Sequence, residues 1–383
     1  MRQFAGVAVK ESEVNAMKNC TKIGWVVLFS VLLAGLGCLG RKEERAGREE
    51  EKVEPVDSKD LPNTIITSHL EEKVIPGKNL IYCSTFQLAW NELRDEIIKE
   101  DIRLTDEPSM VKVLNKKMTT KADISEDCYV ATAGFGGDGI LERINEALRL
   151  KFKHEAPTVE VQLRPDSILA YAFLLKDLKF ATPFESLKAP IRFRSASRTV
   201  RVRAFGIREY RPRQQRHAKM GRQVSILAYE YRTDECVVSL ASKSPRDEII
   251  LARVKPGGTL LETIRSAQKM IEDGRPDSLH SHDTLQIPKL DFDVRHSYAE
   301  LINKFLLNKG FTSYWIARAR QDIRFRLNEK GAMLKSKAEI EVESAQERWL
   351  IFDSPFLVYL REKQGEYPYL AIWVDNPEIL LKQ

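Results

Sequence analysis

Two kinds of hydrophobic spacing divide this chain, and they limit the folds that it can adopt. Between Phe86 and Ile97, apolar residues recur every three to four positions, which is the spacing of an amphipathic helix. Val200 and Val202 instead alternate with arginines, which is the period of a half-buried strand. Helical spacing dominates the N-terminal half and strand spacing the C-terminal half. The sequence therefore predicts a mixed α+β fold.

The same spacing gives approximate bounds for the expected elements. With 383 residues, of which 43% are hydrophobic, the chain can bury the core of one large domain or two ordinary ones. We expect a strand that turns helical over 79–99, and further helices over 140–150, 259–272 and 299–309. Strands are expected over 128–133, 159–175, 199–203, 224–231, 235–241, 247–254 and 289–295, and from there to the C-terminus.

An apolar stretch near the N-terminus has the parts of a signal peptide. It runs from Ile23 to Gly37, follows Lys18 and Lys22, and is shorter than the roughly twenty residues that span a bilayer as a helix. The small residues at its end lead into Cys38. The stretch therefore resembles a bacterial lipoprotein signal, in which the cysteine is acylated after cleavage on its N-terminal side.

These patterns predict three parts and a location. We expect a signal peptide over 1–38 with cleavage before Cys38, a charged tether over 39–62 that lacks hydrophobic periodicity, and a folded domain over 63–383. The protein would then be extracytoplasmic and membrane-anchored in the cell envelope. A short uncleaved anchor is the alternative to lipidation, and Met17 is an alternative start to Met1.

Four segments resemble, in the same order, segments of the serpin superfamily of serine protease inhibitors. The most specific is Leu350–Leu360, LIFDSPFLVYL, which fits the serpin signature around its Pro-Phe pair. The others are Ile168–Phe184, Ile287–Leu301 and Phe325–Gly331. The chain is identified on these segments as a shortened, lipoprotein-like member of that superfamily.

The resemblance implies a fold, a partner and a loop. The fold would have a large central β-sheet, smaller sheets and an N-terminal helical part with fewer helices than usual, including the loss of the helix that lies across the central sheet. The protein would not be an enzyme, and its partner would be a serine protease. The reactive loop would open at Glu329 and Gly331, and its scissile bond would lie near Ala345 and Gln346.

The chain departs from the family in the hinge that must insert into the central sheet. Family hinges use small residues, whereas here Ala332 is followed by Met333, Leu334 and Lys335. The alternation after Gly331 fits a permanent strand or an insertable strand with a poor hinge. We therefore expect a non-inhibitory binding module, with a functional inhibitor that acts by loop cleavage and insertion as the alternative.

A second departure concerns the polar cluster that lies beneath the central sheet in the family. The matching positions hold Cys83, Phe86, Tyr171 and Gln321, which are larger and more apolar groups. Since this cluster governs the opening of the sheet, we expect opening to be impaired.

A glycine motif and a basic stretch suggest other functions. Gly134–Gly139 fits G-x-G-x-x-G between a strand and a helix, which is the context of a dinucleotide site, or else a tight turn. Residues 192–222 contain ten arginines and one acid. They form either a solvated face or a site for a polyanion or an anionic lipid, with Arg201, Arg203, Arg211 and Arg213 as candidate ligands.

The remaining residue types offer little chemistry. Cys83, Cys128 and Cys236 permit at most one disulfide and show no zinc-ligand spacing. The six histidines are scattered, and we find no catalytic arrangement. We therefore expect no metal and no cofactor. We also expect no nucleic-acid partner, because the formal net charge is only +6.

Overall fold

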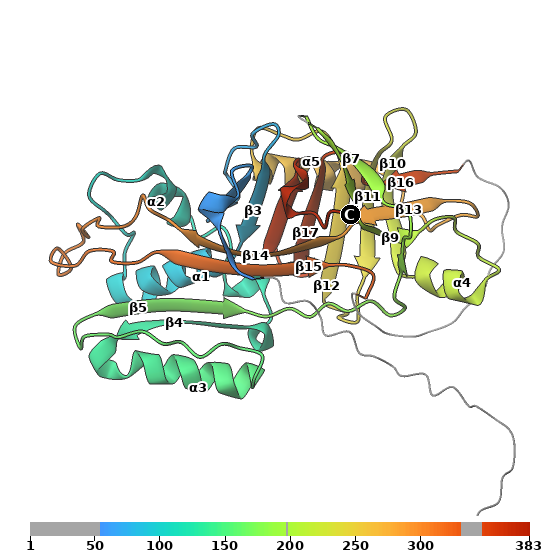
Figure 1. The fold of residues 1–383 in the computed structure, drawn as a ribbon. Coiled ribbons are helices and arrows are strands. Elements are labelled where there is room, and N and C mark those ends of the chain that lie inside the picture. The colour runs from blue at the N-terminus through green and yellow to red at the C-terminus, as the bar shows by residue number, and fades with distance from the viewer. Residues whose placement is uncertain (1–53, 197, 331–346) are drawn as a thin grey trace, which may run out of the picture. The chain divides into compact units, whose positions relative to one another are not determined.

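The computed structural model describes residues 54–330, except Ser197, and residues 347–383. The chain divides into two units, Met1–Glu51 and Lys52–Gln383, and every described residue belongs to the second. Cys38 and the expected loop positions from Gly331 to Gln346 lie outside the described residues. The described unit has an α+β fold, as the sequence predicted (Figure 1).

A seven-stranded sheet forms the largest layer, in the order β10-β11-β12-β17-β18-β3-β2. All neighbouring strands are antiparallel except β2 and β3. The bounds are Thr64–Thr67 (β2), Asn79–Cys83 (β3), Val224–Glu230 (β10), Glu235–Ala241 (β11), Asp247–Arg253 (β12), Phe356–Glu362 (β17) and Leu370–Val374 (β18). The strands expected over 224–231, 235–241 and 247–254 are thereby confirmed.

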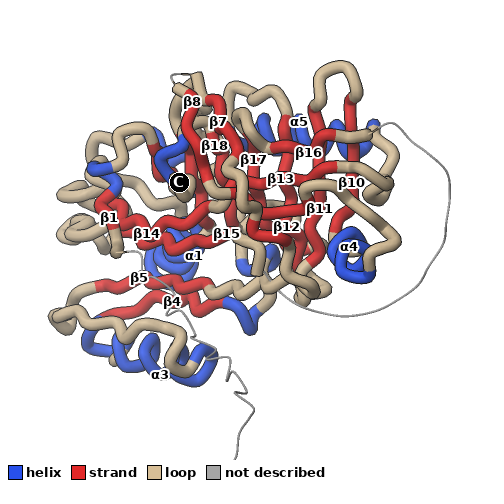
Figure 2. The backbone as a smooth tube through the Cα atoms, turned by 45° about the vertical axis from the view of Figure 1, so that its right-hand side comes forward, coloured by secondary structure: helices blue, strands red, loops and turns tan. Residues whose placement is uncertain are grey.

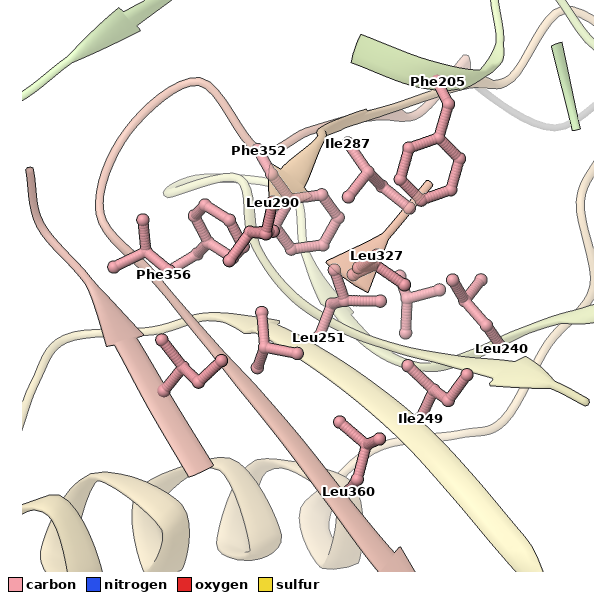
Figure 3. Packing of buried hydrophobic residues seen from close by; sticks show 14 of the residues in the cluster. Phe205, Leu240, Ile249, Leu251, Ile287, Leu290, Leu327, Phe352, Phe356 and Leu360 are labelled. Carbon is pink, nitrogen blue, oxygen red and sulfur yellow. The ribbon is translucent and has the colours of Figure 1, made fainter. Parts of the chain in front are cut away.

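Side chains of this sheet alternate between two apolar layers. One layer, with Val237, Ile250, Leu357 and Trp373, packs against helix α5 (Leu260–Asp273). The next residue along each strand points into the other layer, which is the main core. Figure 3 shows this core, where residues of the sheet, such as Leu251 and Phe356, meet Ile287 and Phe352. The sheet is therefore covered on both faces.

A second, four-stranded sheet covers the main core in the order β16-β13-β9-β6. Its strands are Glu185–Ser186 (β6), Ala204–Ile207 (β9), Thr284–Pro288 (β13) and Trp349–Ile351 (β16). A two-stranded ribbon, β7 (Ile191–Arg194) and β8 (Thr199–Val202), precedes β9. Helix α4 (Gln215–Gly221) follows β9.

A third sheet joins the beginning of the unit to two long strands. Strands β14 (Leu290–Ser297) and β15 (Arg320–Leu327) are antiparallel, and β1 (Val56–Asp57) pairs with β14 in parallel. The first described strand, β1, therefore lies before residue 63, where we expected the folded domain to begin. The side chain of Ser58 reinforces this start because its Oγ lies 2.8 Å from Nδ1 of His296.

The remaining layer is an antiparallel ribbon of β4 (Tyr129–Phe135) and β5 (Ile168–Leu174). Helix α1 (Thr85–Glu92), which continues into the π-helical turn η2 (Leu93–Ile98), contacts both strands. Helix α3 (Ile140–Phe152) packs on side chains of β4 and β5. Helix α3 therefore covers one face of this ribbon.

Two other expectations differ from the structure. Only residues 168–174 of the expected strand over 159–175 are extended in a sheet. Residues 298–319, which link β14 to β15, form turns and isolated bridges and contain no helix, although we expected one over 299–309. Backbone groups there bond to distant partners, such as the amide of Leu307 to the carbonyl of Arg103 at 2.8 Å, which replaces helical pairing.

Candidate functional site

Strands β5 and β15 lie side by side over helix α1, with one edge each left without a strand partner among the described residues. Strand β5 pairs only with β4, and β15 pairs only with β14. Both views place β5 between β4 and β15, and α1 contacts β5 and β15 (Figure 2). Tyr171 on β5 also lies near Asp322 on β15. Burial raises the pKa of Tyr171 to about 12, and the Asp322 carboxylate adds to that rise.

A buried polar cluster fastens β15 to the beginning of α1. The side chain of Gln321 donates from Nε2 to the carbonyl of Cys83 at 2.9 Å and to Oγ1 of Thr85 at 2.8 Å. The hydroxyl of Tyr298 donates to Oε1 of Gln321 at 2.7 Å. Because every group in this set is paired, the cluster resists movement of β15 relative to α1.

This cluster corrects our expectation that larger, apolar groups replace the polar one. Gln321 belongs to it, whereas Tyr171 packs with the residues of α3 and Phe86 packs on the ring of Tyr298 with centroids 4.1 Å apart. Sequence reasoning missed Thr85 and Tyr298. No local sequence signal would have found them, because Thr85 lies 236 positions from Gln321 and Tyr298 lies 23 positions from it.

The end of β15 is closed by contacts at Glu329. The backbone amide of Phe184 donates to the carbonyl of Glu329 at 2.9 Å. The Glu329 carboxylate forms an ion pair with Lys289. Burial acts to raise the pKa of Glu329, but the Lys289 ammonium outweighs it, and the pKa lies below its usual value. Any strand that enters between β5 and β15 from this end must first break these contacts.

A buried ion pair holds the beginning of the second described range, just after residue 346. The Arg348 side chain, 3% exposed, donates to the fully buried Asp283 carboxylate from Nε at 3.1 Å and from Nη2 at 2.8 Å. It also donates from Nη1 to Asp277 at 2.8 Å. The backbone of Arg348 joins the same carboxylate through its amide at 2.9 Å. The residue that precedes strand β16 is thus fixed in place.

Side chains also cover the outer edge of β16. Arg253 donates from Nη1 to the carbonyl of Ile351 at 2.5 Å, and the amide of Trp349 donates to the hydroxyl of Tyr229 at 3.4 Å. Strand edges that carry such partners are poor templates for another strand.

The structure divides the four candidate anion ligands between two places. Arg201 and Arg203 lie beside the C-terminus, where the amide of Arg203 donates to the carbonyl of Leu381 at 2.8 Å. Arg211 lies beyond the other end of β9 and pairs with Glu209 at 2.7 Å, and Arg213 follows it in the same exposed loop. The four residues therefore do not converge on one ligand.

A different set of arginines does share one face, which we call the basic ribbon. It belongs to β7, β8 and the adjoining residues, and all its side chains are exposed: Arg192, Arg194, Arg198, Arg201 and Arg203. Arg192 lies directly opposite Arg201 across the two strands, an arrangement that is unfavourable for like charges. The opposite face carries the buried side chains of Ile191, Phe193 and Val202. Arg194 pairs with Asp353 at 2.8 Å.

The glycine motif forms a packed turn. The amide of Gly136 donates to the carbonyl of Ser167 at 2.8 Å, and the amide of Gly137 donates to that of Pro165 at 2.9 Å. A phosphate would need such amides free. The strand that follows α3 is antiparallel to β4, whereas a dinucleotide fold needs a parallel one. The structure therefore contradicts the dinucleotide hypothesis.

Within the part of the chain that the structure describes, other chemistry is sparse. Cys83, Cys128 and Cys236 are free thiols. Residues 54–330 and 347–383, without Ser197, contain no group of three or more His, Cys, Asp and Glu side chains that could hold a metal ion. None of the helices described has the length and apolar character needed to cross a membrane.

Comparisons with known proteins give similarities at the level of solved structures. No protein family and no curated protein matches the sequence. Human thyroxine-binding globulin complexed with thyroxine matches with 12% identity over 78% of this chain and 92% of its own, at a TM-score of 0.43. Mouse protein-Z dependent protease inhibitor matches with 10% identity over 78% of this chain and 91% of its own, at a TM-score of 0.47. Serpin48, a serpin of the insect Tenebrio molitor, matches with 12% identity over 78% of this chain and 92% of its own, at a TM-score of 0.39.

Proposed function

We propose that this chain is an exported, serpin-like protein that is anchored to a membrane through its N-terminus and acts outside the cytoplasm as a binding module. It is not an enzyme in this proposal. Its binding surface would lie on the side where β15 ends and β16 begins.

One contact carries the proposal, the hydrogen bond from Phe184 to Glu329. It joins two of the segments on which the resemblance to serpins rests, namely the end of Ile168–Phe184 and the opening of the reactive loop in Phe325–Gly331. These segments are more than a hundred residues apart in sequence, so a chance likeness of short motifs gives no reason for them to meet.

The same region supports binding over inhibition. An inhibitory loop must insert faster than the acyl bond to the protease is hydrolysed. Here insertion must break the contacts of Glu329 with Phe184 and Lys289. It must also carry Leu334 and Lys335 past them. Both requirements slow insertion, so a bound protease has time to release a cleaved product.

Inhibition remains the second candidate because β5 and β15 leave facing edges without a strand partner in the described part of the chain. An added strand would satisfy both sets of backbone groups.

Incubation with a panel of serine proteases that accept small side chains distinguishes the two candidates. A binding module is cleaved near Ala345–Gln346 as a substrate, without a covalent adduct in denaturing gels and with little change in melting temperature. An adduct that survives denaturation, or a large rise in melting temperature after cleavage, would establish inhibition and overturn our ranking.

Anchoring has a separate test. If Cys38 is acylated, Cys38→Ser moves the protein from the detergent phase to the aqueous phase. Unchanged partitioning of the variant would refute lipidation and favour an uncleaved anchor.

The basic ribbon supports a polyanion or an anionic lipid as a ligand of this module. Exposed charges attract such ligands with a steep dependence on salt, since screening acts beyond about 10 Å at 0.1 M ionic strength. Replacing Arg192, Arg201 and Arg203 by Gln should abolish retention on heparin, whereas replacing Arg211 and Arg213 should leave most of it. Equal losses in the two variants would show a diffuse charge effect and no site.

A further inference from the structure

Exposed apolar side chains gather at the end of β14 and β15. The described residues include seven exposed large hydrophobic side chains, and three of them lie in the 298–319 segment. These three are Phe305, 47% exposed, Leu307, 49% exposed, and Trp315, 47% exposed. Phe305 and Trp315 form a β-bridge with ring centroids 5.9 Å apart. We call these three residues the aromatic tip.

The aromatic tip is held rigidly, so its exposure is not that of a loosely attached loop. Leu306, between Phe305 and Leu307, is 4% exposed and packs in a core shared with α1 and α2 (Ser109–Leu114). Its amide donates to the carbonyl of Tyr314 at 2.9 Å. The fully buried Asn308 accepts from the amide of Arg103 at 2.9 Å and donates to Glu100 at 2.8 Å. Exposed and buried side chains thus alternate from Phe305 to Asn308, so one side of the segment packs inward and the other faces outward.

Cations border the aromatic tip. Lys309 and Arg318 are exposed and form no ion pair with any described residue. Lys304 pairs with Asp106 at 2.6 Å and Arg103 pairs with Glu100 at 3.8 Å, so both of these acids beside the tip have a cationic partner. Amphipathic aromatic side chains with lysine and arginine beside them are typical of protein surfaces at the boundary of a lipid bilayer.

We propose that the aromatic tip docks on the interface of a lipid bilayer that carries anionic headgroups. This inference rests on the proposed membrane anchoring. Glu54 is sixteen positions beyond Cys38, and an extended chain of that length reaches up to about 55 Å. Residue 54 is two positions before β1, which pairs with the strand that leads into the aromatic tip. An anchor at Cys38 therefore keeps the tip within reach of the bilayer.

Docking through the tip would orient the molecule. The aromatic tip lies where β14 passes into β15, and Glu329 lies beyond the opposite end of β15. The eight residues of β15 span about 26 Å. The contacts at Glu329 would then face away from the bilayer, toward partners in solution.

Fluorescence quenching tests this inference on the full-length protein in vesicles of phosphatidylethanolamine and phosphatidylglycerol with brominated acyl chains. Bromine quenches tryptophans that reach the bilayer. Trp315→Phe should remove at least about half of the bromine quenching that arises from the tryptophans of the folded unit. Trp349→Phe, at a site 53% exposed on β16, is the matched control and should leave quenching unchanged. Phe305→Ser with Leu307→Ser should also lower the quenching of Trp315, with an unchanged melting temperature as evidence of folding.

The outcomes separate this inference from the anchoring. Quenching that is equal in Trp315→Phe and the unmodified protein would overturn the inference, while flotation with the vesicles that depends on Cys38 would leave the anchoring intact. If Trp349→Phe lowers the quenching and Trp315→Phe does not, the β16 side faces the bilayer, and the inference is overturned. A chain that does not float with the vesicles would overturn both proposals.

Discussion

Replacing Arg348 by Met should destabilise the protein strongly, because it leaves the Asp283 carboxylate buried without its charged partner. Asp283 is 0% exposed, and Arg348 is its partner through three hydrogen bonds, two from the side chain and one from the backbone amide. Met keeps the length and apolar stem of Arg, so the substitution removes charge and hydrogen bonds and leaves no large cavity.

Breaking a buried ion pair by removing one partner costs about 3–5 kcal/mol. With a urea m-value of about 3 kcal/mol/M, the unfolding midpoint falls by about 1–1.7 M. Replacing both residues, Arg348→Met with Asp283→Asn, removes the unpaired charge. The double variant should therefore be more stable than Arg348→Met alone.

Urea unfolding of the full-length chain in detergent, followed by tryptophan fluorescence, measures these differences. Arg194→Met is the matched control, because Arg194 also pairs with an aspartate, Asp353, but its side chain is 64% exposed. Exposed pairs contribute about 0–1 kcal/mol. A loss for Arg348→Met no larger than that for Arg194→Met would refute the reasoning.

Three further predictions concern the candidate site and the glycine motif. Gln321→Leu leaves the Tyr298 hydroxyl and a backbone carbonyl unpaired, so thermal unfolding should show a loss of about 1–3 kcal/mol; no loss would mean that water replaces the amide. Gly136→Ala places a methyl group about 2.2 Å from the carbonyl oxygen of Arg164, so urea unfolding should show a loss of about 1–3 kcal/mol, and an unchanged midpoint would contradict this packing. The pKa of Glu329 is lowered on folding. Its ionised form therefore stabilises the folded state fully at pH values above the unfolded pKa of about 4.3. This stabilisation is lost as the pH falls through the lower pKa of the folded state. Glu329→Gln should therefore lower the melting temperature at pH 7 and make no difference at strongly acidic pH; a difference independent of pH would exclude this ion pair as its cause.

The sequence predicted the elements whose signals are local. Helix α5 carries a capping box, in which Thr259 and Glu262 bond each other's backbone amides. The hairpin of β17 and β18 follows from two apolar runs separated by a short polar turn. Each of these signals lies within a few residues of the structure that it specifies, so no knowledge of distant partners was required.

What the sequence could not predict depends on distant contacts. The apolar spacing over 299–309 fits a helix, but the fold gives its backbone better partners at Arg103 and Tyr314. The candidate arginines were chosen by proximity in sequence. Strand β9, which runs between Arg203 and Arg211, carries them to separate places.

The order of strands in the large sheet determines when the fold can close during synthesis. Strands β17 and β18 join the β10–β12 group to the β2–β3 pair, so the sheet stays in two pieces until these two strands are made. About a hundred residues separate the end of β12 from the start of β17, which at 5–20 residues per second is a delay of roughly 5–20 s. Throughout that interval the inner edges of β12 and β3 have no neighbour. The large sheet can close only after β18 is made, so its completion comes after the synthesis of every other strand in it.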